Sequence, residues 1–169
     1  MSDLGISAGT ILFVDDEEDF RSSEAELLRM DYGYYGDEAG NAEDALQLAR
    51  GVNRYQVALI DQVLQGSMNG IDLMRALRAE QPQVDVILLT GYGKEPETGA
   101  LQAGAYRFLE KPVQLEVLHQ MLMLCIDAQQ ARSDRDTARR EHALLQTLLD
   151  LSQQVGGSLR QEEILQAAY

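Results

Sequence analysis

Short apolar runs alternate with longer segments of helical periodicity from residue 10 to about residue 110. The runs are rich in Val, Ile, Leu and aromatic residues, a composition typical of buried β-strands. This pattern predicts strands over residues 10–14, 32–35, 57–60, 84–89 and 106–109, of which the second has the weakest signal.

The segments between these strands carry apolar residues at helical spacing. Asn41 precedes Ala, Glu and Asp, which predicts an N-cap with acidic residues in the first helical turn. Gly51 follows the last periodic residue of that segment as a stop signal, and Asn69 with Gly70 predicts another helix start. Helices are therefore expected within residues 20–29, 42–49, 71–77 and 100–103.

Strands that alternate with helices imply parallel pairing, because each helix carries the chain back to the starting edge of the sheet. We therefore predict an α/β fold with a five-stranded, parallel, doubly wound sheet and helices on both of its faces. Ligands of such sheets bind beyond the carboxyl ends of the strands. Functional residues are expected at that edge.

The helical pattern continues from Leu115 through the rest of the chain, which predicts a long C-terminal helix. Two series of positions follow the heptad pattern of a coiled coil. They are Met121, Ala128, Arg135, His142 and Leu149, and Leu124, Ala131, Ala138, Leu145 and Ser152. Alanines line the middle of this seam, and Arg135 and His142 interrupt it. We expect a moderately stable homodimer through this helix, for which a parallel arrangement fits best.

Composition and charge exclude several classes of function. The 28 acidic and 14 basic residues give a net charge of -14, which argues against direct nucleic-acid binding and against membrane binding within this chain. The single cysteine, Cys125, lies in an apolar segment and is expected to be a buried hydrophobic residue. Neither a secretory signal nor an apolar stretch of membrane-spanning length is found, so the expected location is cytoplasmic.

Polar residues follow four of the predicted strands. Asp15 and Asp16 follow the first strand, Asp61 the third, Thr90 the fourth and Lys111 the fifth. Because the carboxyl ends of parallel strands lie at one edge, these carboxylates, the hydroxyl and the ammonium group are expected to converge. A carboxylate at the end of a buried run, such as that of Asp61, is costly unless something pairs with it.

Clustered carboxylates repel one another unless a cation joins them. Mg²⁺ takes a few carboxylates and keeps several waters, so Asp15 and Asp16 are candidate ligands of that ion. With the metal and Lys111 neutralising a phosphoryl group, Asp61 is expected to attack phosphorus in line and Thr90 to donate to a phosphoryl oxygen.

Residues 8–126 resemble the receiver domain of two-component response regulators. The matching motifs are the acidic pair in FVDDEED, the aspartate in VALIDQ, the TG of LLTGYG and the KP of FLEKP. They occur in the family's order, each at the end of a predicted strand. The resemblance implies a flavodoxin-like fold in which Asp61 accepts a phosphoryl group from a histidine kinase or a phosphotransfer protein.

The resemblance also implies roles for the other residues at the strand ends. Lys111 contacts the phosphoryl group, its bond to Pro112 is one that is often cis in the family, and Thr90 is the switch hydroxyl. Phe108 matches the switch aromatic, and Tyr106, on the same face of the strand, is a second candidate for that role. The implied Mg²⁺ ligands are Asp15, Asp16, Asp61 and the backbone carbonyl of Val63. Such a chain is not an enzyme in the ordinary sense, because it catalyses only its own Mg²⁺-dependent phosphorylation and dephosphorylation.

The pattern divides the chain into three parts. Residues 1–126 are expected to form the receiver domain, and residues 127–152 a coiled-coil signalling helix that relays the change to a downstream output module. Residues 153–169 are expected to begin a truncated downstream domain, since they resemble the first helix and turn of a GAF domain.

Three alternative classes compete with this interpretation. A degenerate receiver would act as a phosphorylation-independent dimerisation or docking module, which the intact acidic pair, Thr90 and Lys111 disfavour. A hydrolase of the haloacid dehalogenase type needs a second aspartate two residues after Asp61, where Val63 stands. A nucleotide-binding Rossmann domain needs a glycine-rich loop after the first strand, where FVDDEED stands.

Overall fold

The computed structural model describes residues 10–91 and 107–166, with side chains described up to residue 149 and at residue 151. The chain divides into two compact units, Met1–Gln129 and Gln130–Tyr169. The boundary between them lies within helix α5 (Leu115–Gln166), three residues beyond the predicted end of the receiver at residue 126.

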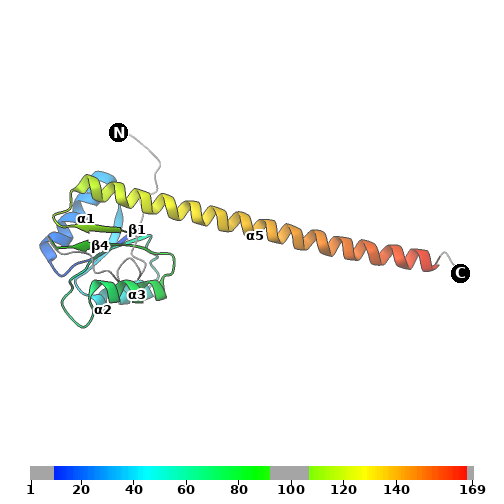
Figure 1. The fold of residues 1–169 in the computed structure, drawn as a ribbon, viewed down its shortest axis with the longest axis horizontal. Helices are drawn as coiled ribbons and strands as arrows, with labels where there is room; N and C mark the ends of the chain where they lie inside the picture. Colours follow the sequence, from blue (N-terminus) through cyan, green and yellow to red (C-terminus); the bar gives the residue numbers. More distant parts are fainter. Residues whose placement is uncertain (1–9, 92–106, 167–169) are drawn as a thin grey trace. The chain divides into compact units, whose positions relative to one another are not determined.

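The first unit holds a five-stranded parallel sheet with the strand order β2-β1-β3-β4-β5 (Figure 1). Its strands are β1 (Thr10–Val14), β2 (Tyr35–Ala39), β3 (Val57–Asp61), β4 (Asp85–Thr90) and β5 (Arg107–Glu110). The chain leaves β1 toward one side to form β2 and then crosses to the other side to form β3, so the strand order switches direction between β1 and β3. The predicted parallel, doubly wound α/β fold is confirmed.

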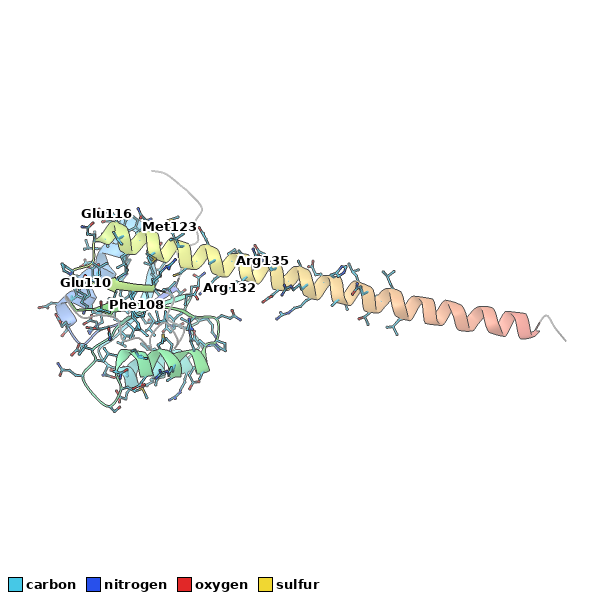
Figure 2. The ribbon with its side chains drawn as sticks, viewed as in Figure 1. Phe108, Glu110, Glu116, Met123, Arg132 and Arg135 are labelled. Carbon is cyan, nitrogen blue, oxygen red and sulfur yellow. The ribbon has the colours of Figure 1, made fainter. Side chains whose placement is uncertain are left out.

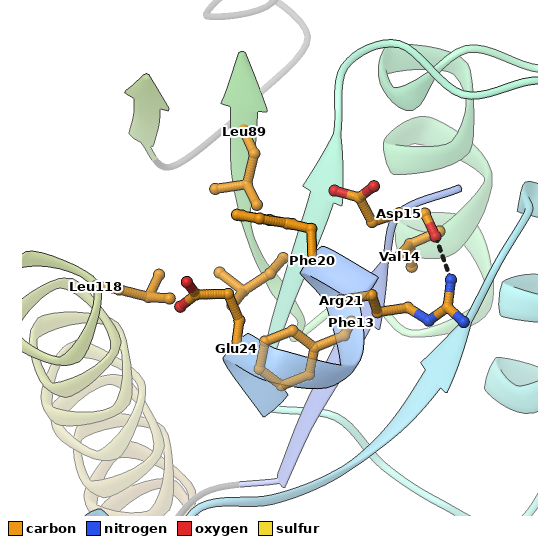
Figure 3. A pocket seen from close by; sticks show the side chains of 9 residues that line it. Phe13, Val14, Asp15, Phe20, Arg21, Glu24, Leu89 and Leu118 are labelled. Carbon is orange, nitrogen blue, oxygen red and sulfur yellow. Dashed lines mark hydrogen bonds between the residues drawn. The ribbon is translucent and has the colours of Figure 1, made fainter. Parts of the chain in front are cut away.

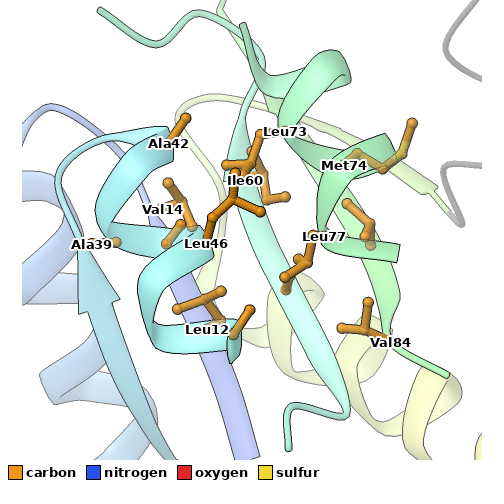
Figure 4. Packing of buried hydrophobic residues seen from close by; sticks show 14 of the residues in the cluster. Leu12, Val14, Ala39, Ala42, Leu46, Ile60, Leu73, Met74, Leu77 and Val84 are labelled. Carbon is orange, nitrogen blue, oxygen red and sulfur yellow. The ribbon is translucent and has the colours of Figure 1, made fainter. Parts of the chain in front are cut away.

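Alternating side chains of the central strands supply a core on each face of the sheet. Leu12 and Ile60 belong to one core, which α2 (Ala42–Arg50) and α3 (Gly70–Glu80) cover (Figure 4). Phe13 and Leu59 belong to the other, which α1 (Glu18–Tyr32) and the first part of α5 cover. Both β3 and β4 are buried at every position, as expected for strands covered on two faces.

The predicted helix caps are confirmed by their hydrogen bonds. The side chain of Asn41 accepts from the backbone N–H of Asp44 at 2.8 Å. Asn69 accepts from the N–H of Asp72 at 2.9 Å, which starts α3 in the same way. The N–H of Gly51 donates to the carbonyl of Leu48 at 3.0 Å and ends α2.

The prediction of a strand at residues 32–35 is wrong. Tyr32 is the last residue of α1, and Gly33 caps that helix with φ at 71° in the left-handed region. Tyr34 is buried, and the strand begins only at Tyr35. As an edge strand, β2 carries exposed polar residues, so its apolar signal is weaker than that of the tyrosines before it.

The first part of α5 packs on the sheet through Leu118, Leu122 and Cys125, which are all buried. Met121 is partly buried against the same core, so the prediction that it starts the coiled-coil seam is wrong. Its heptad spacing reflects packing on the sheet. At the end of this unit the side-chain amide of Gln129 donates to the backbone carbonyls of Gln56 and Gln83.

The second unit is the remainder of α5, in which residues 130–149 are all exposed. The helix continues through Gly156 and Gly157 to Gln166, so residues 153–166 contain no turn. No helix in the described part of the chain combines the length and apolar character needed to cross a membrane. The helix expected at residues 100–103 lies outside the described residues.

Candidate functional site

The sheet places the predicted site residues at one edge. Val14 pairs with Ile60, so the residues that follow them, Asp15 and Asp61, lie side by side at the switch in strand order. Thr90 is the last residue of β4, and Lys111 follows β5. The parallel register therefore brings together residues that are far apart in the sequence, as predicted.

Lys111 joins the two buried carboxylates. Its Nζ lies 2.6 Å from Oδ2 of Asp15 and 2.7 Å from Oδ2 of Asp61. The side chain of Lys111 is 16% exposed, against 4% for Asp15 and 9% for Asp61. Burial lowers the pKa of Lys111, but hydrogen bonds and charge interactions with the two aspartates outweigh that effect, and the net pKa is raised. The ammonium form is therefore fixed between them.

Backbone groups orient both carboxylates. Oδ1 of Asp15 accepts from the N–H of Glu17 at 2.9 Å, and Oδ1 of Asp61 accepts from the N–H of Val63 at 3.0 Å. Each aspartate thus uses one oxygen for a backbone amide and the other for Lys111. A β-carbon at Gly70 would lie only 2.1 Å from the carbonyl oxygen of Asp61, so glycine allows the start of α3 to approach the end of β3.

Two residues of α1 support this cluster and were not predicted. Nζ of Lys111 lies 4.5 Å from the ring centroid of Phe20, a cation–π geometry. Nη1 of Arg21 donates to the backbone carbonyl of Asp15 at 2.5 Å (Figure 3). Both side chains line a small apolar pocket behind Asp15, together with Glu24, whose pKa is raised by burial. The sequence feature that could have indicated both residues is their position in the first turn of the helix that follows Asp15 and Asp16.

The carboxylates of Asp15, Asp16 and Asp61 could hold a metal ion. One oxygen of each lies within 4.8 Å of the others, and Asp16 is half-buried while the other two are buried. Hard oxygen donors in this number suit Mg²⁺, which binds through few carboxylates and retains water. The donor set therefore fits the predicted ion. The metal-binding role of the Val63 carbonyl stays a prediction.

Two of the three predicted switch residues, Thr90 and Phe108, lie within the described part of the chain. Thr90 is buried, and its Oγ1 lies 3.5 Å from the carbonyl oxygen of Leu109, too far for a strong hydrogen bond. Phe108 lies on β5, opposite Leu88 of β4, and packs partly buried against the core beneath α2 and α3 (Figure 2). Tyr106 lies outside the described residues. The bond between Lys111 and Pro112 is cis.

The chain is similar in sequence to one known protein family and to individual members of it. The profile of the family described as "Response regulator receiver domain" matches residues 11–123. The nitrogen assimilation regulatory protein NtrX of Azorhizobium caulinodans is 38% identical over 108 residues, which cover 62% of this chain and 23% of NtrX. The transcriptional regulatory protein FixJ of Rhizobium meliloti is 32% identical over 148 residues, covering 86% of this chain and 71% of FixJ.

A solved structure supports the same grouping. The CheY-like response regulator receiver domain protein of Methanospirillum hungatei JF-1 superimposes with a TM-score of 0.68 at 28% sequence identity. The match covers 75% of this chain and 99% of that structure. The similarity thus extends over a whole receiver domain, whereas this chain spans 23% of the length of NtrX.

Proposed function

The chain belongs to the response regulator receiver domain family, and from that premise we propose that Asp61 accepts a phosphoryl group from a histidine kinase or a phosphotransfer protein. The observation that supports this proposal is the meeting of Asp61 with Asp15, Asp16 and Lys111 at the carboxyl edge of the sheet. A strand-end carboxylate, further hard oxygen donors and a fixed ammonium group are the parts that phosphoryl transfer to aspartate requires.

Each residue of the site has a separate role in the proposed phosphoryl transfer. A carboxylate oxygen of Asp61 forms a bond to phosphorus as the bond from phosphorus to the donor's imidazole nitrogen breaks. Lys111, already 2.7 Å from Oδ2 of Asp61, stabilises the negative charge of the phosphoryl oxygens. Asp15 and Asp16, with Asp61 and the Val63 carbonyl, would hold Mg²⁺, which would supply further positive charge.

Phosphorylation is proposed to act on the rest of the chain through Thr90 and Phe108. Thr90 donates to a phosphoryl oxygen, and Phe108 repacks against the face of β5 as Thr90 moves. The positions of these residues on the adjacent strands β4 and β5 support a coupled movement. The chain is then not an enzyme in the ordinary sense, because its own Asp61 is the site that becomes phosphorylated and dephosphorylated.

We propose that the change is relayed through a homodimer of the C-terminal helix to an output module. The exposed leucines of that helix, such as Leu145 and Leu149, support self-association. In this proposal residues 1–126 are the receiver, residues 127–152 the signalling helix and residues 153–169 the start of a downstream domain. The assignment of that last domain as GAF rests on sequence resemblance alone.

The test of the phosphoacceptor role is the intact mass of the protein after incubation with acetyl phosphate. We expect wild type to gain one phosphoryl group of about 80 Da only when Mg²⁺ is present, and Asp61→Asn to gain none. Asp72→Asn, at an exposed carboxylate on α3, is the matched control and should be phosphorylated normally. An Asp61→Asn adduct at the same site, or a wild type that neither gains mass nor binds beryllofluoride, would refute the assignment.

A further inference from the structure

The second unit presents an apolar face that no described residue of the chain covers. Leu144, Leu145, Leu148 and Leu149 are between 53% and 62% exposed on a helix whose neighbouring residues are all exposed too. A single helix in water gains most of its stability from packing its apolar face against a partner. Leu145, Leu148 and Leu149 therefore need a partner surface, and the charges beside them indicate which one. Leu144 lies outside the heptad seam of this helix.

The heptad register fixes where those charges lie. With Met121 assigned to the receiver core, the central positions of the second unit form two series. The first (a) positions are Arg135, His142 and Leu149, and the fourth (d) positions are Ala131, Ala138 and Leu145. In this register the positions just before the a residues (g) carry Asp134 and Glu141, whereas those just after the d residues (e) carry Arg132 and Arg139. One flank of the seam is thus acidic and the other basic.

Parallel and antiparallel helix pairs bring different flanks of the seam into contact. In a parallel, in-register pair, each g residue faces the e residue of the following heptad in the other helix. Asp134 then faces Arg139 of the second copy, and the same offset of five relates Asp127 to Arg132. In an antiparallel pair, g faces g and e faces e, which would place acidic beside acidic and basic beside basic residues.

We infer that the occupant of this face is a second copy of the chain in a parallel, in-register, two-stranded coiled coil, selected by ion pairs between Asp134 and Arg139 of opposite copies. The inference rests on the dimerisation proposed above and specifies its orientation and register. Arg135 (Figure 2) stands at a central position, where a polar residue weakens the pair but favours one register. In this arrangement it lies next to Asp134 of the other copy.

Disulfide cross-linking of the full chain tests the orientation. Ala131→Cys and Leu145→Cys each place a thiol at a d position, and Ser133→Cys places one on the outer face as the matched control. The parallel, in-register pair predicts that Ala131→Cys and Leu145→Cys each cross-link to themselves on oxidation. The control and the wild type, whose Cys125 is buried, should remain uncross-linked. In an antiparallel pair the d residues of one helix face a residues of the other, so neither Ala131→Cys nor Leu145→Cys would cross-link to itself.

Charge reversal tests the ion pairs. Asp134→Arg and Arg139→Asp should each raise the dimer dissociation constant about 2- to 30-fold, since two exposed pairs are lost per dimer. The double variant should return to near the wild-type value. Residues five apart do not face each other along one helix, so this recovery reports contact between copies. Sedimentation equilibrium, with and without beryllofluoride, measures each constant.

Each outcome has a separate meaning. A wild type that sediments as a monomer at about 100 µM, or as an assembly larger than a dimer, overturns this inference. The monomer would also overturn the dimeric relay, but phosphorylation of Asp61, read from intact mass, would stand. A dimer in which neither Ala131→Cys nor Leu145→Cys cross-links to itself overturns the parallel orientation alone. Parallel cross-linking without recovery in the double variant overturns the selecting role of Asp134 and Arg139.

Discussion

At the scale of single residues, Lys111 holds the site together. The sequence predicted that it would meet Asp15 and Asp61, because all three end or follow parallel strands. It did not reveal that one ammonium group would contact both carboxylates while backbone amides occupy their other oxygens. That detail depends on distances of tenths of an ångström, which strand order does not determine.

Removing this ammonium group should destabilise the fold. Lys111→Met leaves two buried carboxylates facing each other without a cation, so we expect the free energy of unfolding at pH 7 without Mg²⁺ to fall by about 2–4 kcal/mol. Urea denaturation measures this loss. Added Mg²⁺ should reduce the difference from wild type, because the ion replaces part of the lost positive charge.

A surface ion pair gives the control. Arg75 contacts Asp72 at 3.1 Å on α3, with both side chains at least half exposed. Arg75→Met should therefore lower the free energy of unfolding by no more than about 0.5 kcal/mol. Losses of equal size in the two variants would contradict the structural importance of Lys111.

At the scale of the elements, local signals predicted the helix ends well, whereas contacts between distant elements were not predictable. The caps at Asn41 and Asn69 follow from neighbouring residues. The attachment of α5 to the end of α1 does not, because its partners are far apart in the sequence. His119 stacks on Tyr32 with ring centroids 3.7 Å apart, and its Nδ1 lies 3.1 Å from the hydroxyl of Tyr34.

This attachment should depend on pH. Burial lowers the pKa of His119, so the folded state favours the neutral ring. The groups around it are Tyr32, Tyr34, whose pKa is raised to about 12, and Asp127, which interacts with Tyr34. The contribution of His119 to stability is therefore fully present above its ordinary pKa of about 6.5 and is lost as the pH falls through the lowered value.

Chemical denaturation between pH 7 and pH 5 measures the effect. The free energy of unfolding of wild type should fall more over this range than that of His119→Gln, which cannot take up a proton. Protonation of the carboxylates contributes to both proteins and cancels in the difference. Identical pH dependence in the two proteins would show that His119 titrates equally in the folded and unfolded chains.

At the scale of the whole molecule, the chain should separate into an autonomous domain and a dependent helix. A chain shortened to residues 1–129 retains Leu118, Leu122 and Cys125, which complete the core under α5. We expect it to fold with a free energy of unfolding within about 0.5 kcal/mol of the full chain in the monomeric state. Ending the chain at residue 114 removes all three residues and should cost more than about 4 kcal/mol. Calorimetry and urea denaturation compare the fragments.

The heptad pattern shows where sequence interpretation reached its limit at this scale. Met121 and Leu145 satisfy the same spacing, yet Met121 packs against its own sheet, while Leu145 is exposed. Periodicity reports that a helix face is apolar, but not which surface covers it. The helix also continues through Gly156 and Gly157, because glycine permits a helix end without requiring one.

Gln129, the last residue of the first unit, is hydrogen-bonded to the starts of two central strands, β3 and β4. Its amide donates to the carbonyls of Gln56 and Gln83, which lie just before β3 and β4, and these strands end in Asp61 and Thr90. Apolar packing tolerates small sliding, whereas hydrogen bonds are directional. Slippage of one strand along the other would break one of these hydrogen bonds, at a cost of about 0.5–1.5 kcal/mol. The last residue of the first unit thereby opposes relative translation of the two strands that end in Asp61 and Thr90.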